Sequence, residues 1–257
     1  MNQFIDSHIH LYDPEYDADL EEVISRAKAE GVNRCVLPAI DSGTHNKMVD
    51  LARLYPGFVF PSIGLHPTSV KSDWESELSF VFDNIDKNEF YAVGEIGMDG
   101  YWSKEFLKEQ SVAFEKQIEL AVQKGLPVII HSRDATEEIF KVLERIRHLG
   151  ISGVFHAFSG SFETYKRLSG IGNFMFGIGG VITFKNASLA KVAEKMDLQD
   201  IILETDGPWL TPAPFRGKRN EPSYISLISE KLAAIKGCSI EEIANTTTLN
   251  AEKLFKI

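Results

Sequence analysis

The chain has 257 residues, of which 27 are basic and 37 acidic, so its formal net charge is −10. Hydrophobic residues make up 44% and charged residues 25% of the chain, which excludes a disordered protein, a collagen-like fibre and a low-complexity chain. The acidic balance argues against broad electrostatic binding of nucleic acid, because phosphates must be neutralised by Lys and Arg. The acidic balance does not exclude a phosphate-bearing substrate that binds at one local site.

The cysteines and the N-terminus bear on the cellular compartment. Cys35 and Cys238 lie far apart and form no CxxC pair, so we expect a reducing compartment and no disulfide framework. The segment MNQFIDSHIH has no apolar core of a signal peptide, and the longest uncharged stretch, residues 168–184, contains five glycines. We therefore expect a cytoplasmic protein without membrane contact or an obligate protein partner.

Apolar segments typical of strands alternate with amphipathic segments typical of helices along the whole chain. The expected strands cover residues 4–9, 35–40, 58–65, 91–96, 128–130, 153–155, 174–177 and 201–203. The expected helices cover residues 17–30, 48–54, 74–85, 104–124, 136–148, 162–168, 187–196, 223–236 and 240–255. Gly31 and Gly125 follow two of these helices, as expected of residues that end a helix.

Eight strands that are each followed by a helix imply parallel pairing through right-handed crossovers. Eight such units in about 250 residues is the size of a (β/α)₈ barrel. An open, doubly wound sheet is the alternative, but no glycine-rich dinucleotide turn follows the first strand. The sequence thus predicts a (β/α)₈ TIM barrel forming a single α/β domain over residues 1–257.

Polar residues gather where the expected strands end. Five of the seven histidines and two acids occupy such positions: His8, His10, His66, Glu95, His131, His156 and Asp206. The C-terminal ends of barrel strands share one face, where barrel enzymes build their active sites. Residues that are far apart in the sequence are therefore expected to converge on one pocket.

Each of these residues has an ordinary structural explanation when it is taken alone. His8 and His10 have the i, i+2 spacing that points two side chains to one face of a strand, but two structural histidines would look the same. Glu95 lies within an apolar strand, where a salt bridge is the alternative to a metal. Histidines can be core residues, and Asp206 could cap a turn. Their coincidence on one face favours metal binding.

Four histidines and two carboxylates exceed what one tetrahedral metal site uses. They suit two divalent cations with one bridging carboxylate, and we predict His8, His10, Glu95, His131, His156 and Asp206 as the ligands. Imidazole favours zinc or manganese, whereas magnesium prefers oxygen, so the ion used in cells stays open. Two such cations opposite two carboxylates would leave a positive site that attracts phosphate.

Other residues near this face are candidates for supporting roles. Asp6, Asp99 and Glu204 could orient the histidines. We expect substrate contacts from His66, Arg133, Arg216 and Lys218. A surface ion pair is the alternative for Arg133, and a solvated basic loop is the alternative for the last two residues.

Seven motifs, which follow one another over nearly the whole chain, match the pattern of a known family. They are IDSHIHL at 5–11, GLHP at 64–67, VGEIGMD at 93–99, PVIIHSRDA at 127–135, GVFHAFSGS at 153–161, LETDGPWLTP at 203–212 and RGKRNEP at 216–222. The sequence resembles the TatD family of metal-dependent hydrolases in the amidohydrolase superfamily of (β/α)₈ barrels. The resemblance implies a deoxyribonuclease that trims DNA from the 3′ end.

The resemblance also implies how the ligands divide. His8, His10, Glu95 and Asp206 would hold one metal, and Glu95, His131 and His156 the other. The chain departs from the family pattern without losing a ligand at Ala157, Gly207, Trp209 and the segment 100–102. Some relatives resemble D-aminoacyl-tRNA deacylases, so substrate preference is what these changes put in doubt.

We therefore predict a hydrolase in which metal-activated water attacks a phosphodiester bond. Asp206 and Glu95 are the predicted catalytic residues, with Asp206 accepting the proton of the water. The second metal, with Arg133 or the basic loop, would stabilise the charge on the phosphate. The alternatives are an ester or amide hydrolase, such as a D-aminoacyl-tRNA deacylase, and a catalytically inactive barrel that binds a partner.

Overall fold

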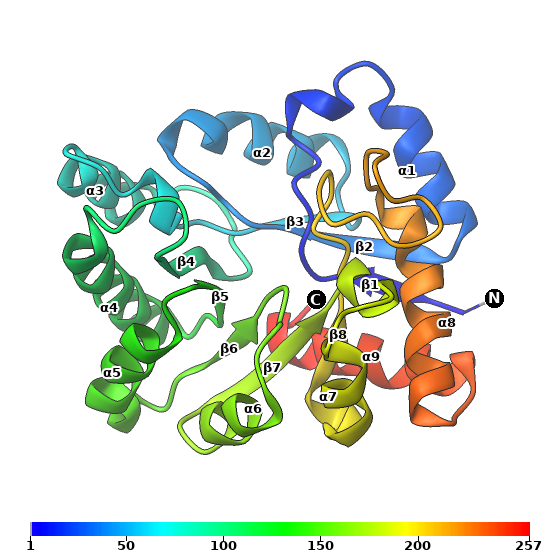
Figure 1. Ribbon diagram of the computed structural model, residues 1–257. Helices are drawn as coiled ribbons and strands as arrows, with labels where there is room; N and C mark the ends of the chain where they lie inside the picture. Colours follow the sequence, from blue (N-terminus) through cyan, green and yellow to red (C-terminus); the bar gives the residue numbers. More distant parts are fainter. Residues whose placement is uncertain (1) are drawn as a thin grey trace.

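Eight parallel strands form a ring in chain order, with helices packed around its outside (Figure 1). The computed structural model describes residues 2–257. Its strands are β1 (Phe4–Asp6), β2 (Val32–Leu37), β3 (Val59–Pro61), β4 (Val93–Asp99), β5 (Val128–Arg133), β6 (Ser152–Phe155), β7 (Asn173–Ile178) and β8 (Ile201–Leu203). This is the predicted (β/α)₈ barrel, not an open sheet.

Two short junctions close the ring. Strands β1 to β3 pair in one ladder and β4 to β8 in another. A parallel bridge between Ile63 and Val93 joins the two ladders. The backbone N–H of Ser7 donates to the carbonyl of Leu203 at 3.0 Å and links the start of the chain to the end of β8. The strand ends of both ladders therefore face one common mouth.

The helices alternate with the strands, except that two helices follow β8. They are α1 (Leu20–Ala29), α2 (Ser42–Leu54), α3 (Trp74–Asn84), α4 (Leu107–Lys124), α5 (Thr136–Ile146), α6 (Phe162–Ser169), α7 (Leu189–Lys195), α8 (Ile225–Lys236) and α9 (Ile240–Phe255). No helix within residues 2–257 is both long enough and apolar enough to span a bilayer.

Local chemistry explains the boundaries that differ from expectation. Helix α2 begins at Ser42, six residues before the predicted start at 48, because Asp41 and Thr44 form a reciprocal capping box. The Asp41 carboxylate accepts the Thr44 backbone N–H at 3.1 Å. Helix α4 ends as predicted at Gly125, whose φ of 66° suits glycine.

The interior of the barrel is apolar at its N-terminal end. One buried side chain from each of six strands or strand starts lines it, and the C-terminal turn of α9 packs beneath them. These residues are Ile5, Val36, Ala92, Ile129, Val154 and Ile202, with Ala251, Leu254 and Phe255 from α9. Figure 1 shows α9 behind the strands. Because hydrophobic side chains fill this end, a polar site inside the barrel can form only at the opposite mouth.

Candidate metal centre

The period of the strands carries the site residues directly above this apolar layer. In β5, Ile129 belongs to the layer and His131 lies two residues later, on the same face. The same step leads from Val154 to His156. Strand β4 departs from this pattern, since its pairing with β5 is irregular between Val93 and Ile96, where Glu95 lies.

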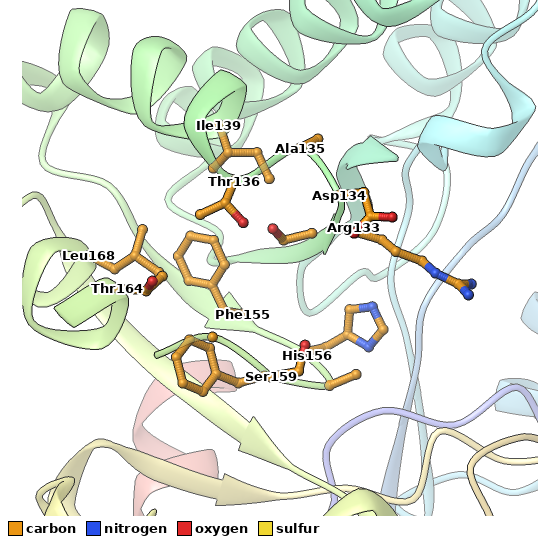
Figure 2. Close-up of a pocket in the computed structure, with 14 residues that line it drawn as sticks. Arg133, Asp134, Ala135, Thr136, Ile139, Phe155, His156, Ser159, Thr164 and Leu168 are labelled. Atoms are coloured by element: carbon orange, nitrogen blue, oxygen red, sulfur yellow. The ribbon is translucent and has the colours of Figure 1, made fainter. Parts of the chain in front are cut away.

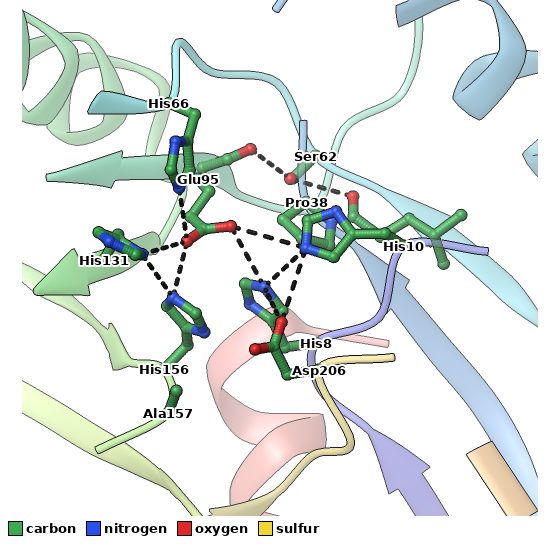
Figure 3. Close-up of polar contacts among 12 residues, drawn as sticks. His8, His10, Pro38, Ser62, His66, Glu95, His131, His156, Ala157 and Asp206 are labelled. Atoms are coloured by element: carbon green, nitrogen blue, oxygen red, sulfur yellow. Dashed lines mark hydrogen bonds and ion pairs between the residues drawn. The ribbon is translucent and has the colours of Figure 1, made fainter. Parts of the chain in front are cut away.

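One oxygen of Glu95 faces a first group of ligand atoms (Figure 3). Glu95 Oε2 lies 3.2 Å from His8 Nε2 and 3.8 Å from His10 Nε2. Asp206 Oδ1 completes the group at 3.6 Å from His8 Nε2 and 3.8 Å from His10 Nε2. Two imidazoles and two carboxylates therefore point their lone-pair atoms at one small volume.

The other oxygen of Glu95 faces a second group. Glu95 Oε1 lies 2.6 Å from His156 Nε2, 2.9 Å from His131 Nδ1 and 3.2 Å from His66 Nε2. The carboxylate of Glu95 therefore stands between two separate sets of nitrogens, in the position that a bridging ligand requires. The structure brings together all six predicted ligands, and their role in holding metal remains a prediction.

Hydrogen bonds fix which ring nitrogen of two histidines is available. The Tyr12 hydroxyl donates its only hydrogen to the Pro38 carbonyl at 2.5 Å, so it accepts from Nδ1–H of His10 at 2.8 Å. His10 Nε2 is therefore left with a lone pair. Asp99 Oδ2 accepts from Nε2–H of His131 at 2.9 Å, which leaves His131 Nδ1 as its ligand atom.

His66 differs from these histidines. Its Nδ1 accepts the backbone N–H of Thr68 at 3.1 Å, so a neutral His66 carries its hydrogen on Nε2. That Nε2–H donates to Glu95 Oε1. A nitrogen that carries hydrogen has no lone pair for a cation, so we expect His66 to be a donor at the centre, even though it lies with Glu95 and His131 in a group close enough to hold an ion.

Nitrogen atoms approach one another closely in both groups. His8 Nε2 lies 3.2 Å from His10 Nε2, and His131 Nδ1 lies 3.1 Å from His156 Nε2. Two lone pairs at these separations repel each other unless a proton or a cation lies between them. Imidazole and carboxylate donors in these numbers fit two divalent cations of the zinc or manganese type.

The ionisation of the carboxylates reflects this crowding. Burial opposes the charge on Glu95, but the histidines around it, His156 first, outweigh burial and hold its pKa well below the usual value. Burial raises the pKa of Asp206 to about 7, with the nearby charge of His8 opposing the rise. Burial acts to lower the pKa of His131, but Asp99 and Glu95 raise it to about 9. Cation binding would therefore displace protons from this centre.

The expected substrate contacts at Arg133, Arg216 and Lys218 are exposed, and none pairs with a carboxylate within residues 2–257. The Arg133 guanidinium lies 3.7 Å from the centre of the Tyr101 ring and 5.4 Å from that of Trp102. These contacts replace the surface ion pair that was the alternative for Arg133.

Basic side chains of the loop after β8 also pack on aromatic rings. The Arg216 guanidinium lies 3.8 Å from the centre of the Phe184 ring, and Lys218 Nζ lies 5.4 Å from that of Phe215. The next residue, Arg219, pairs with Asp19 at 2.7 Å. The first two cations of this run are therefore free for an anionic ligand, whereas the third is occupied.

An open space adjoins the centre on the side of β5 and β6. It is a cavity of about 290 Å³. Figure 2 shows residues that line it, among them Arg133, Thr136, His156, Ser159 and Thr164. Its volume is just below the range for small-molecule sites, which begins at about 300 Å³. The cavity is therefore large enough for one small group of a substrate beside the predicted ligands.

Sequence reasoning named Asp99 as an orienting residue but missed the partners of His10 and His66. Tyr12 and Thr68 each lie two residues after a histidine of the centre, His10 and His66. The H-x-Y and H-x-T spacings were visible signals, because both put a hydroxyl within reach of the ring. The acceptor role of the Pro38 carbonyl left no such signal.

Comparison with known proteins decides the family. The family model described as TatD related DNase matches residues 5–256. The chain belongs to the TatD family of metal-dependent hydrolases. The predicted resemblance is thereby confirmed.

Relatives of this TatD-family protein match nearly end to end. The "uncharacterized metal-dependent hydrolase YabD" of Bacillus subtilis is 41% identical over 253 residues, which is 98% of each chain. "Deoxyribonuclease TATDN3" of Homo sapiens is 34% identical over 268 residues, covering 98% of this chain and 94% of the human one. The crystal structure of YjjV, a TatD homologue from Escherichia coli, superimposes with a TM-score of 0.93 at 29% identity, covering 99% and 98% of the two chains.

Proposed function

We propose that this TatD-family hydrolase is a deoxyribonuclease that removes nucleotides from the 3′ end of DNA. The observation that carries the proposal is the carboxylate of Glu95, whose two oxygens face separate sets of ligand atoms. Two cations that share one carboxylate suit in-line displacement at a phosphate. The name of the human relative, a deoxyribonuclease, supports the choice of substrate.

The protein would hold the cations in two groups. His8, His10 and Asp206 would bind the first, His131 and His156 would bind the second, and Glu95 would bind both. When bound, zinc, manganese or magnesium supplies Lewis acidity at the phosphate and makes water acidic enough to attack near neutral pH.

The proton of the attacking water passes to the carboxylate of Asp206. The side chain of Asp206 is 13% exposed, whereas that of Glu95 is 2% exposed, so Asp206 is the acid that a water at the mouth can reach. His66 remains neutral and offers its Nε2–H to an oxygen at the centre. His66 is a positioning residue, because the backbone N–H of Thr68 donates to its Nδ1 and so holds the orientation of the ring.

Exposed cations around the mouth would hold the DNA backbone. Arg133 lies on the side of β5, and Arg216 and Lys218 lie after β8. Local positive groups of this kind allow an acidic protein to bind a polyanion at one place only. We expect the cavity beside His156 to receive the terminal nucleotide.

The test compares substrates on one protein. Single-stranded oligonucleotides labelled at the 3′ or the 5′ end are incubated with the enzyme and Zn²⁺, Mn²⁺ or Mg²⁺, with Asp206→Asn as the inactive control. The proposal expects the 3′ label to leave as a mononucleotide at once and the 5′ label to yield a ladder. A D-aminoacyl-tRNA is tested in parallel. Hydrolysis of that ester without cleavage of either oligonucleotide would contradict the proposal and favour the deacylase alternative.

A further inference from the structure

Three buried polar atoms beneath the centre have no hydrogen-bond partner within residues 2–257. They are His8 Nδ1, His156 Nδ1 and Glu204 Oε2. One nitrogen of each histidine and one oxygen of Glu204 all lie within 4.8 Å of one another. The side chains of His8 and Glu204 are fully buried, and that of His156 is 5% exposed. Buried polar atoms without partners are costly, so three of them together call for an explanation.

The two histidines are arranged as a pair. Their rings stack with centroids 3.9 Å apart and planes 8° from parallel. Each presents Nε2 to a different oxygen of Glu95. For Nε2 to give its lone pair to a cation, the hydrogen of the neutral ring must be on Nδ1. Each Nδ1–H then needs an acceptor, and metal-binding histidines nearly always have one.

Glu204 is the acceptor that both rings can share. Its Oε1 accepts the backbone N–H of Ala157 at 2.5 Å, which fixes the carboxylate beside the residue that follows His156, just after β6. Gly177 on β7 makes room for it, because a β-carbon there would collide with Oε2. The fold therefore supplies both a tether and a space for a carboxylate at this place.

We propose that Glu204 is a positioning residue that receives Nδ1–H of both His8 and His156 through one shared water and so holds one ligand of each cation. The proposal rests on the two-cation centre of the proposed function. His156 Nδ1 lies 4.0 Å from Glu204 Oε1, which is longer than a direct hydrogen bond. One water that accepts from both rings and donates to the carboxylate spans such a distance, and three polar partners suffice to hold it.

This role differs from those of the other orienting groups. Tyr12 acts on His10 alone, which belongs to the first group, and Asp99 acts on His131 alone, which belongs to the second. Glu204 faces one histidine of each group. Loss of Glu204 should weaken both cations together, whereas loss of Tyr12 or Asp99 should weaken one.

The experiment measures Zn²⁺ binding to the full chain by calorimetry and elemental analysis, so its readout does not depend on activity. Glu204→Met keeps the volume and removes the acceptor, and Glu204→Gln keeps an oxygen that can accept. Tyr12→Phe and Asp99→Leu, which remove the acceptors of His10 and His131, are the single-site controls. We expect Glu204→Met to lose about 10–100-fold in affinity at both sites, Glu204→Gln to recover much of it, and each control to weaken one site.

Two results separate the possible failures. A wild-type protein that binds fewer than two Zn²⁺ ions would refute the two-cation centre itself. A wild-type protein that binds two, with Glu204→Met retaining both affinities or losing only one, would overturn the role of Glu204 alone.

A second measurement needs no variant and so covers the case in which Glu204→Met does not fold. Nitrogen NMR of the Zn²⁺-loaded wild type reports which ring nitrogen carries hydrogen. Nδ1–H protons of both His8 and His156 that are shifted downfield and exchange slowly, as hydrogen-bonded protons do, support the proposal, and an Nδ1–H of either ring without these signs of an acceptor would overturn it.

Discussion

Histidine ring nitrogens at the centre are divided between protein partners and the predicted cations. His10 and His131 each commit one nitrogen to a fixed acceptor, Tyr12 or Asp99. His66 commits its Nδ1 to a donor instead. The same residue type therefore serves as ligand or as hydrogen-bond donor according to one neighbour, which is how five clustered histidines can have different roles.

Among single residues, we expect Asp206 to affect turnover more than it affects metal binding. Asp206→Asn keeps an oxygen near His8 and His10 but removes the proton acceptor. We expect the fold and most of the bound Zn²⁺ to remain while kcat for the oligonucleotide falls about 10²–10⁴-fold. Steady-state kinetics on metal-loaded protein check this. Turnover close to that of the wild type would show that another group takes the proton.

We expect Glu95 to affect mainly the number of metal ions that the protein binds. Glu95→Ala removes the carboxylate that lies between the two nitrogen groups. We expect bound Zn²⁺, measured by elemental analysis, to fall from two ions per chain to one or none. Glu241→Ala, which removes an exposed carboxylate on α9, is the control and should keep two. An unchanged stoichiometry in Glu95→Ala would refute the bridging role.

Under the proposed function, we expect the exposed side chain of Trp102 to contact DNA. Its side chain is 70% exposed, and its backbone N–H donates to Asp99 Oδ1 at 3.1 Å, so its loop is tied to the carboxylate that orients His131. Base stacking on an aromatic ring contributes about 1–3 kcal/mol.

The corresponding prediction separates binding from chemistry. Trp102→Ala should raise KM for an oligonucleotide about tenfold, as expected for the loss of one stacked base. Its kcat/KM for bis(4-nitrophenyl) phosphate, which has no base, should stay unchanged. Leu249→Ala, at an exposed apolar residue of α9, is the matched control. An equal loss on both substrates would place the defect in the centre.

At the scale of elements, strand period made much of the site predictable. The i, i+2 step places His131 above Ile129 and His156 above Val154, so the sequence sufficed for these strands. Strand β4 was different, because its pairing with β5 is irregular at Glu95, which was predicted from its place in an apolar strand and not from the i, i+2 step. The contact between Arg133, at the end of β5, and Tyr101, which follows β4, depends on tertiary packing. Helix α2 also began earlier than hydrophobic periodicity indicated, since its capping box decides the start.

Gly97 shows how closely two elements are fitted. Its φ is 139°, and a β-carbon there would overlap the carbonyl oxygen of His131 on the paired strand. Gly97→Ala should therefore lower stability by more than about 2 kcal/mol and weaken Zn²⁺ binding through His131. Gly57→Ala is the matched control, because Gly57 also has a positive φ but no atom within 4 Å of a β-carbon. Thermal unfolding of both checks this, and equal shifts in Tm would contradict it.

For the molecule as a whole, the barrel provides two ends with opposite character. Apolar side chains and α9 fill one end, and buried histidines and carboxylates converge at the other. Composition and alternation predicted this architecture, because parallel strands must present their C-terminal ends together. The net charge of −10 did not indicate the local cations around the mouth.

Metal binding should stabilise the whole fold, because its ligands come from both ladders of the ring. A ligand that binds only the folded state at 100 times its Kd adds about 2.7 kcal/mol. We expect Zn²⁺ to raise Tm relative to chelated protein by several degrees, on the order of 5–10 °C. Calorimetry with and without chelator checks this. The same shift in Glu95→Ala would mean that Zn²⁺ stabilises the chain from somewhere else.

The most direct test is anomalous diffraction from a crystal of the Zn²⁺-loaded protein. The account predicts two peaks, one on each side of the Glu95 carboxylate, the first among His8, His10 and Asp206 and the second beside His131 and His156, with His66 outside both coordination spheres. A single peak, or a peak coordinated by His66, would contradict it.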